Sequence, residues 1–219
     1  MVSQRALIVV SGTSCQEDAL RRFRQPDDVI IAVDGGAHHC LRLGWRPHVV
    51  IGDFDSLSPE YLQQFEQEGV LLLRYPPEKD ETDLELALQY AVQRGYRHIR
   101  ILCALGGRVD QTLANLFLLG LPVLKNLDVR LEDGEVEAFL IDSEAEWQGV
   151  PGETVSLIPL FGVAQGIWTE GLRYPLRGET LYPERSRGIS NEMVDHQARV
   201  RLSQGVLLCI HFHSDTGGS

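Results

Sequence analysis

The sequence predicts an α/β fold in two parts: a mostly parallel sheet with flanking helices in residues 1–125, and an antiparallel β-sandwich in residues 126–219. One reason is that short apolar runs alternate with helical periods up to about residue 125, which is typical of βα repeats. A second is that the later strand candidates follow one another with no helical period between them. A third is that acidic residues recur where the strands of the first part are expected to end.

Five short runs in the first part are rich in β-branched residues and leucine and lack polar alternation. This pattern is typical of strands that are buried on both faces of a parallel sheet. In chain order the runs are Ala6–Val10, Val29–Val33, Val49–Ile51, Val70–Arg74 and Ile99–Leu105.

Helices are predicted between these strands. Ser58 followed by Pro59 offers an N-cap with proline at the first helical position. Thr82 stands at capping-box spacing from Glu85, ahead of apolar residues at helical intervals. Another helical period follows Gly106–Gly107. The alternation predicts a three-layer, Rossmann-like arrangement.

Strands alone are predicted in the second part, with the boundary near Leu121–Leu127. Two turn signals, Asp133-Gly134 and Ser203-Gln204-Gly205, each predict a hairpin between the strands that flank them. The tail from Ser214 to Ser219 is expected to be disordered. The strand candidates are Val129–Leu131, Val136–Ile141, Val155–Leu160, Ile167–Thr169, Gly171–Leu176, Arg199–Leu202 and Val206–Phe212.

Composition narrows the class of partner. Hydrophobic residues make up 43% of the 219 residues and charged residues 23%, as in ordinary globular proteins. The net charge of −11 lacks the basic face that a nucleic-acid partner requires, so no nucleic-acid partner is expected. No run reaches the ~18 apolar residues of a membrane span, so no membrane partner is expected either.

The four cysteines are widely spaced and form no Cys-x-x-Cys pair, so we expect free buried thiols and a cytoplasmic location. His211 and His213 would share one face of a strand and could bind a metal. With no third ligand nearby in the sequence, a solvated strand end is the favoured interpretation.

Four acidic patches follow the predicted strands of the first part. Because the carboxyl ends of parallel strands share one edge of a sheet, these patches are expected to meet in one crevice. Clustered aspartates repel one another unless a cation lies among them, and Mg²⁺ bound to nucleotide phosphates suits oxygen ligands. The patches are Val33-Asp34-Gly35-Gly36, Gly52-Asp53-Phe54-Asp55-Ser56, Lys79-Asp80-Glu81-Thr82-Asp83 and Gly106-Gly107-Arg108-Val109-Asp110.

Each patch alone also has a plain structural interpretation. Asp53 and Asp55 would project from the same side of an extended backbone and could hold one Mg²⁺, yet a lone Asp-x-Asp is usually a solvated loop. Thr82 is explained by helix capping alone, and so is Asp110. Arg108 after two glycines could bind phosphate, or lie on the surface beside a tight turn.

Motifs that are missing narrow the chemistry further. The chain has no Gly-x-x-x-x-Gly-Lys-Ser/Thr P-loop, no Gly-x-Gly-x-x-Gly after its first strand and no Gly-x-Ser-x-Gly nucleophile elbow. Carboxylates, a lysine and an arginine without a covalent nucleophile favour phosphoryl-type transfer by positioning and charge neutralisation.

The order and spacing of the four patches resemble those of the thiamine pyrophosphokinase family. Two later motifs, Gly171-Leu172-Arg173-Tyr174-Pro175-Leu176 and Gly188-Ile189-Ser190-Asn191-Glu192, resemble the C-terminal motifs of that family. The resemblance spans roughly residues 30–215. It implies Mg²⁺-dependent transfer of the β,γ-diphosphate of ATP to thiamine with release of AMP, an α/β catalytic domain, a β-sandwich domain, and a homodimer with thiamine at the subunit interface.

The resemblance also implies roles for individual residues. Asp53, Asp55 and Asp83 would form the catalytic metal site, and Arg108 would act with them. The residues expected to bind ATP or thiamine are Asp34, Gly35, Lys79, Asp80, Thr82, Gly107, Asp110, Tyr174, Ser190 and Asn191.

Two positions depart from the family pattern. Gln111 stands where relatives often have histidine, and Tyr174 where some have tryptophan. Two other functions stay open: a pyrophosphokinase that acts on a hydroxymethylpterin, and a catalytically silent regulator that binds a nucleotide or thiamine.

Overall fold

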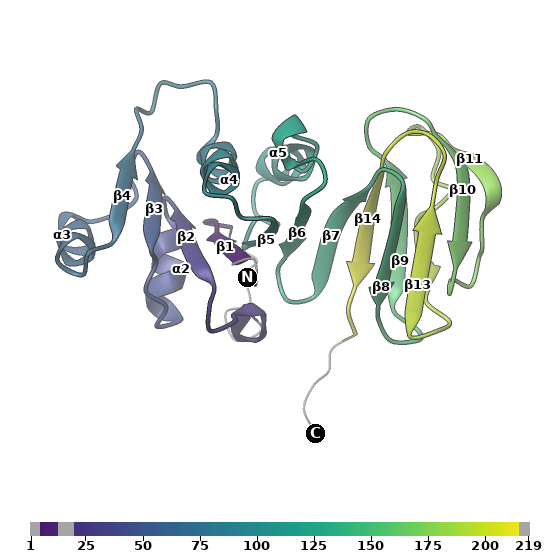
Figure 1. Ribbon diagram of the computed structural model, residues 1–219, viewed down its shortest axis with the longest axis horizontal. Coiled ribbons are helices and arrows are strands. Elements are labelled where there is room, and N and C mark those ends of the chain that lie inside the picture. The colour runs from purple at the N-terminus through teal and green to yellow at the C-terminus, as the bar shows by residue number, and fades with distance from the viewer. Residues whose placement is uncertain (1–4, 13–19, 215–219) are drawn as a thin grey trace. The chain divides into compact units, whose positions relative to one another are not determined.

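The computed structural model describes residues 5–12 and 20–214 of the chain (Figure 1). The chain divides into two compact units, Met1–Gly134 and Glu135–Ser219. The division falls later than the predicted boundary near Leu121–Leu127. Strand β6 (Asp128–Glu132) explains the difference, because it pairs in parallel with the last strand predicted for the first part.

The first unit contains a parallel sheet in the order β6-β5-β1-β2-β3-β4. All five predicted strands are present; the bounds of β2 match the prediction, and the ends of the others differ by at most three residues. The residues of β1, β2 and β3 are almost all buried, as their apolar runs predict, whereas β4, at the edge of the sheet, has no buried residue. The strands are β1 (Arg5–Val9), β2 (Val29–Val33), β3 (Val49–Gly52), β4 (Leu71–Arg74) and β5 (His98–Leu102).

Helices cover this sheet, and the α/β fold class is confirmed. Helix α2 contacts β1 and β2, α3 contacts β4, and α4 contacts β2 and β3. Ser58 caps α3 and Thr82 caps α4, as the sequence predicts. The helices are α2 (Gly36–Arg42), α3 (Pro59–Gln67), α4 (Asp83–Gln93) and α5 (Val109–Leu118), with short 3₁₀ turns η1 (Arg21–Phe23) and η2 (Pro122–Leu124).

The strand order reverses between β1 and β5. Strands β1 to β4 succeed one another toward one edge, and the chain then returns to place β5 on the other side of β1. Loops at such a reversal diverge and leave a crevice at the carboxyl ends of the strands. This crevice is where the candidate active site lies.

The second unit contains two antiparallel layers of strands, in the orders β12-β9-β14-β7 and β11-β10-β13-β8. Alternate residues of both layers form one apolar core that includes Phe139, Trp147, Leu157 and Val200. The β-sandwich is therefore confirmed. Its strands are β7 (Val136–Ile141), β8 (Glu144–Gln148), β9 (Thr154–Pro159), β10 (Ala164–Glu170), β11 (Arg177–Leu181), β12 (Asn191–Glu192), β13 (Gln197–Arg201) and β14 (Leu207–Phe212).

Two predictions for this unit are wrong. Gly171–Leu176 is not a strand: it connects β10 to β11, and its only ladder contact among the described residues is an isolated bridge from Leu172 to Met193. Ser203–Gly205 does not close a hairpin, because β13 pairs with β8 and β10 while β14 pairs with β7 and β9. The turn carries the chain from one layer to the other.

The expectations for cysteine and histidine need correction. Cys40 and Cys209 are free and buried, but Cys103 is disulfide-bonded, so free thiols are not general. His211 is fully buried rather than part of a solvated strand end. Of the tail predicted to be disordered, residues 215–219 lie outside the described residues, whereas Ser214 is hydrogen-bonded to Glu153. No helix in the described part of the chain is long and apolar enough to cross a membrane.

Candidate active site

Two adjoining cavities open at the carboxyl edge of the parallel sheet. The first, of about 360 Å³, lies at the reversal of strand order, between the residues that follow β1 and those that follow β5. The second, of about 290 Å³, extends toward the ends of β2 and β3 and the start of α4. Both are lined by Val10, Ser11, Gln111 and Asn115, so they form one continuous cleft.

Three carboxylates meet at this edge. Oxygens of Asp34, Asp53 and Asp55 lie within 4.8 Å of one another. Asp34 follows β2, and the other two follow β3. Because β2 and β3 are parallel neighbours, their ends bring the motifs together as the sequence predicts. Asp83 is outside this trio, which differs from the predicted grouping of Asp53, Asp55 and Asp83.

The backbone between Asp53 and Asp55 is a tight turn rather than an extended segment. Phe54 has a φ of 68°, in the left-handed region that side chains other than glycine seldom adopt. Its ring is buried, and the guanidinium of Arg74 stacks 4.9 Å from the ring centroid, which holds the turn in place. The N–H of Asp55 donates to Oδ1 of Asp53 over 3.0 Å. The two carboxylates are thus brought together by a strained turn and not by strand alternation.

Electrostatic repulsion from its neighbours acts on Asp55. The charges of Asp53 and then Asp34 raise the pKa of Asp55 above its ordinary value, with smaller contributions from desolvation and Asp83. Asp34 holds Ser56 through Oδ2, which accepts from the hydroxyl over 2.9 Å. Its other oxygen, Oδ1, is buried and has no hydrogen-bond partner among the described residues.

This donor set fits Mg²⁺. The ion prefers oxygen ligands, keeps several waters and is usually bound through one or two carboxylates together with substrate phosphates. An unsatisfied carboxylate oxygen and mutually repelling neighbours are the features that a bound cation would relieve.

Lys79 and Asp83 lie on the opposite wall of the cleft. Thr82 caps α4 by accepting from the N–H of Glu85, which sets Asp83 in the first turn. Nζ of Lys79 is 2.9 Å from Oδ1 of Asp83, and the lysine side chain is only 12% exposed. Asp80 is exposed and does not line either cavity, whereas Glu81 does.

The Gly-Gly-Arg motif forms the far end of the cleft. Gly106 and Gly107 have φ of 80° and 73°, which an L side chain rarely adopts, so the glycines are required by the turn. Arg108 is the N-cap residue of α5 and pairs bidentately with Asp110, whose pKa its hydrogen bonds lower. Both side chains are well exposed, at 72% and 65%, so the pair contributes little to stability and can exchange for a phosphate ligand.

The cleft residues that were not predicted as site residues include Ser11, Gln111 and Asn115. Asn115 is buried, and its Nδ2 donates to the carbonyl of Ala104 over 2.7 Å, which fixes the loop after β5. A polar residue in an otherwise apolar helical period was the available signal. Ser11 follows β1 on the same edge, and Gln111 lines both cavities.

The second unit has its own cavity of about 280 Å³, beside Tyr174 and Asn191. Tyr174 is 64% exposed, so its ring is accessible. Asn191 is buried, and its side chain bonds both backbone polar groups of Tyr174, at 3.0 and 2.9 Å. Asn191 therefore positions the tyrosine segment. Ser190 lies beside the cavity without lining it, held through its N–H by Ser156.

Comparison with known proteins covers both units. A model of the thiamin pyrophosphokinase catalytic domain matches residues 20–131, and a model of the thiamin pyrophosphokinase vitamin B1 binding domain matches residues 140–207. A thiamine pyrophosphokinase of Bacillus subtilis (strain 168) is 30% identical over 205 residues, which are 93% of this chain and 96% of that protein.

Solved structures agree with this comparison. The crystal structure of thiamine pyrophosphokinase from Bacillus subtilis has a TM-score of 0.86 at 26% identity and covers 96% of this chain and 100% of that one. The Geobacillus thermodenitrificans thiamin pyrophosphokinase has a TM-score of 0.83 at 27% identity, covering 97% and 99%. Yeast thiamin pyrophosphokinase shares the fold, with a TM-score of 0.79 at 14% identity, covering 97% and 87%.

Proposed function

This chain belongs to the thiamin pyrophosphokinase family, and from that premise we propose that it transfers the β,γ-diphosphate of ATP to the hydroxyl of thiamine, giving thiamine diphosphate and AMP. The observation that carries the proposal is the cleft at the reversal of strand order. There, Asp34 and Asp53 line the same cleft as Lys79 and Arg108, and Asp55 lies beside them, with oxygens of the three aspartates within 4.8 Å of one another. That arrangement suits a triphosphate and its metal.

The proposed reaction is a single in-line displacement. The hydroxyl oxygen of thiamine attacks the β-phosphorus, and the bond from that phosphorus to the oxygen bridging it to the α-phosphorus breaks. AMP leaves with both electrons of that bond. The hydroxyl proton passes to a carboxylate of the cleft, Asp55 or Asp83.

Positioning accounts for the other residues. Mg²⁺ held by Asp34, Asp53 and Asp55 would neutralise charge that develops on the phosphates. Lys79 lies near enough to the cleft wall to contact the triphosphate after releasing Asp83. Arg108 has a guanidinium that matches phosphate oxygens bidentately once Asp110 is displaced. In this proposal Asp83 either accepts the hydroxyl proton of thiamine or contacts Mg²⁺ through a water molecule.

Thiamine is proposed to occupy the cavity beside Tyr174 in the second unit. The exposed ring of Tyr174 offers an aromatic face to the cationic thiazolium. The homodimer implied by the family resemblance would bring this cavity to the ATP cleft of the partner subunit. The cytoplasmic location expected from the sequence stays a prediction.

The activity is tested by incubating the full chain with ATP, Mg²⁺ and either thiamine or 6-hydroxymethyl-dihydropterin. We expect AMP to form with thiamine alone. Turnover of the pterin without turnover of thiamine would show that the acceptor is a hydroxymethylpterin and not thiamine. If no AMP forms with either compound but the chain binds thiamine or ATP, the chain is a catalytically silent regulator.

Mixing of two inactive variants tests the shared site. Asp55→Asn disables the ATP cleft, and Tyr174→Ala disables the thiamine cavity. If each site combines the first unit of one subunit with the second unit of its partner, random mixing makes half of the dimers heterodimers. Each heterodimer has one intact site out of two, so activity returns to about a quarter of the native level. If each site instead lies within one subunit, every site in the mixture carries one of the two substitutions, and activity would stay absent.

A further inference from the structure

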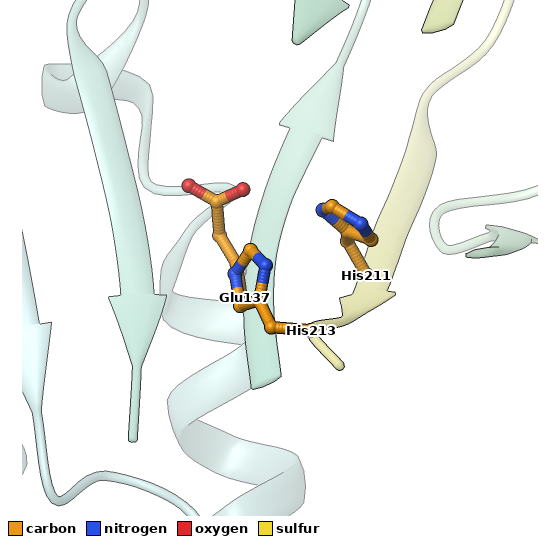
Figure 2. Close-up of side chains that lie close together, drawn as sticks. All are labelled: Glu137, His211 and His213. Atoms are coloured by element: carbon orange, nitrogen blue, oxygen red, sulfur yellow. The ribbon is translucent and has the colours of Figure 1, made fainter. Parts of the chain in front are cut away.

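A cluster of two imidazoles and one carboxylate lies in the second unit, apart from the cavity beside Tyr174. His211 and His213 stand two apart at the end of β14, on the same side of the strand, and Glu137 is the direct cross-strand neighbour of His211 on β7. Figure 2 shows the histidines coming from the end of β14 and Glu137 from β7. One ligand atom from each lies within 4.8 Å of the other two.

His211 is oriented by a buried carboxylate. Its Nε2 is 2.8 Å from Oε2 of Glu153, and both side chains are almost fully buried. Glu153 also accepts from the backbone N–H groups of Val150 and Ser214. Because an ionised carboxylate only accepts, the proton of a neutral His211 is on Nε2, and Nδ1 carries a lone pair.

That lone pair has no partner. Nδ1 of His211 is buried, and no donor among the described residues reaches it. Since Nε2 is engaged by Glu153, Nδ1 is the nitrogen that His211 can offer to the cluster. A histidine that donates one N–H to a carboxylate and presents its other nitrogen to a group of ligands has the arrangement of a metal-binding histidine.

We propose that Glu137, His211 and His213 form a binding site for a divalent transition metal of the Zn²⁺ class. Two imidazoles and a carboxylate suit Zn²⁺ and its neighbours, whereas Mg²⁺ prefers oxygen ligands alone. Two ligands at about 2.1 Å from a tetrahedral ion lie ~3.4 Å apart, so a pair at the widest separation of 4.8 Å must approach by ~1.4 Å. His213, half-buried at the end of its strand, can supply that movement.

The site would join two neighbouring strands. Glu137 lies on β7, His211 on β14 and His213 directly after it, so a bound ion would cross-link the two strands where β14 ends. Its three protein ligands leave a fourth position for water. The site is separate from the carboxylate cleft of the first unit, whose clustered ligand atoms are all oxygens.

Cobalt titration provides the test. The full chain, stripped of metals with a chelator, is titrated with Co²⁺ in excess Mg²⁺, and the visible absorption of nitrogen-ligated Co²⁺ is followed. We expect one equivalent to bind, to be displaced by Zn²⁺, and to raise the unfolding midpoint. His213→Ala and Glu137→Gln should each weaken binding at least about tenfold.

Two matched variants act as controls. His196→Ala removes an exposed histidine of the same unit, and Asp55→Asn alters the carboxylate cleft; neither should change the Co²⁺ titration. Failure of the native chain to bind Co²⁺ would show that the cluster is a hydrogen-bonded network without an ion. Equal binding by His213→Ala and the native chain would place the ion elsewhere. Circular dichroism verifies that each variant is folded, and Glu137→Gln replaces His213→Ala if the latter is not.

Discussion

Replacing Gly36 with alanine is expected to damage both the fold and the cleft. Gly36 begins α2, and its backbone conformation is an ordinary helical one, so the glycine is not needed for its φ. A Cβ at this position would lie 2.0 Å from the carbonyl oxygen of Val9 and 2.8 Å from its carbonyl carbon. Real Cβ atoms essentially never come within 3.0 Å, so helix and strand must separate by about 1 Å.

The magnitude follows from two opposing effects. Alanine favours the helix by about 1 kcal/mol relative to glycine. Overpacking costs about 1–3 kcal/mol, and the upper end applies because both clashing atoms belong to the backbone. The net loss of stability is therefore about 2 kcal/mol. Since Asp34 lies two residues before Gly36, a shift of ~1 Å in the carboxylate cluster should lower kcat/KM about 100-fold.

Urea unfolding and steady-state release of AMP measure the two effects. Gly44→Ala is the matched control, because Gly44 has a φ of 67° and a Cβ at its position would meet no atom within 4 Å. It should lose about 1 kcal/mol to backbone strain and keep full activity. Native stability and activity in Gly36→Ala would refute the close approach of α2 to β1.

Three further predictions concern charge and the aromatic face. Asp55→Asn should lower turnover at least about 100-fold and abolish stabilisation by Mg²⁺, because it removes a proposed ligand; an unchanged rate would remove Asp55 from the site. The raised pKa of Asp55 means that its charge opposes folding, so this variant should melt at a higher temperature than the native chain when Mg²⁺ is absent. Burial alone would raise the pKa of Asp128, but Arg100 and a second arginine outweigh it and lower the pKa to about 2. Asp128→Asn should therefore cost about 1–2 kcal/mol at neutral pH after allowance for partial exposure, and the difference should disappear as the pH falls from about 4 to 2 in acid unfolding. Tyr174→Ala should lower kcat/KM for thiamine at least about 100-fold, to a level that is inactive in the assay, while Tyr174→Phe stays near native, and equal effects of both would assign the role to the hydroxyl.

The features that the sequence predicts well are those that local chemistry determines. Strands buried on both faces are largely apolar, so β1, β2 and β3 appear in the sequence as apolar runs. Ser58 and Thr82 predict helix starts because each side chain accepts a backbone N–H of its own first turn. Parallel strands share an edge, so the acidic motifs are expected to meet, and Asp34, Asp53 and Asp55 do.

Features that depend on strand pairing or contacts between residues far apart in the chain cannot be predicted from local sequence patterns. The run around Val129 looks the same whether it pairs with β5 or with a sandwich strand, so the predicted boundary falls too early. The turn at Ser203–Gly205 has hairpin chemistry, but turn residues do not determine which layer receives the next strand. Burial of His211 depends on Glu153, 58 positions earlier, and no local pattern reveals that contact.

The site shows the same division. The residue types and their order predict a carboxylate cleft, but the choice of Asp34 over Asp83 as the third member depends on side-chain direction. Asp83 is drawn to Lys79, which is four residues earlier and forms an ion pair with it. Asn115 was not predicted because it holds the loop after β5 through the carbonyl of Ala104, and the position of that loop cannot be inferred from the sequence.

Labelled ATP tests the central claim most directly. ATP that carries ¹⁸O on the non-bridging oxygens of its β-phosphate is incubated with the full chain, Mg²⁺ and thiamine, and the products are analysed by ³¹P NMR and mass spectrometry. Transfer of the diphosphate as a unit predicts AMP and thiamine diphosphate in equal amounts, with the label on the phosphorus joined to thiamine. Label retained in ADP, with thiamine monophosphate as the product, would contradict attack at the β-phosphorus.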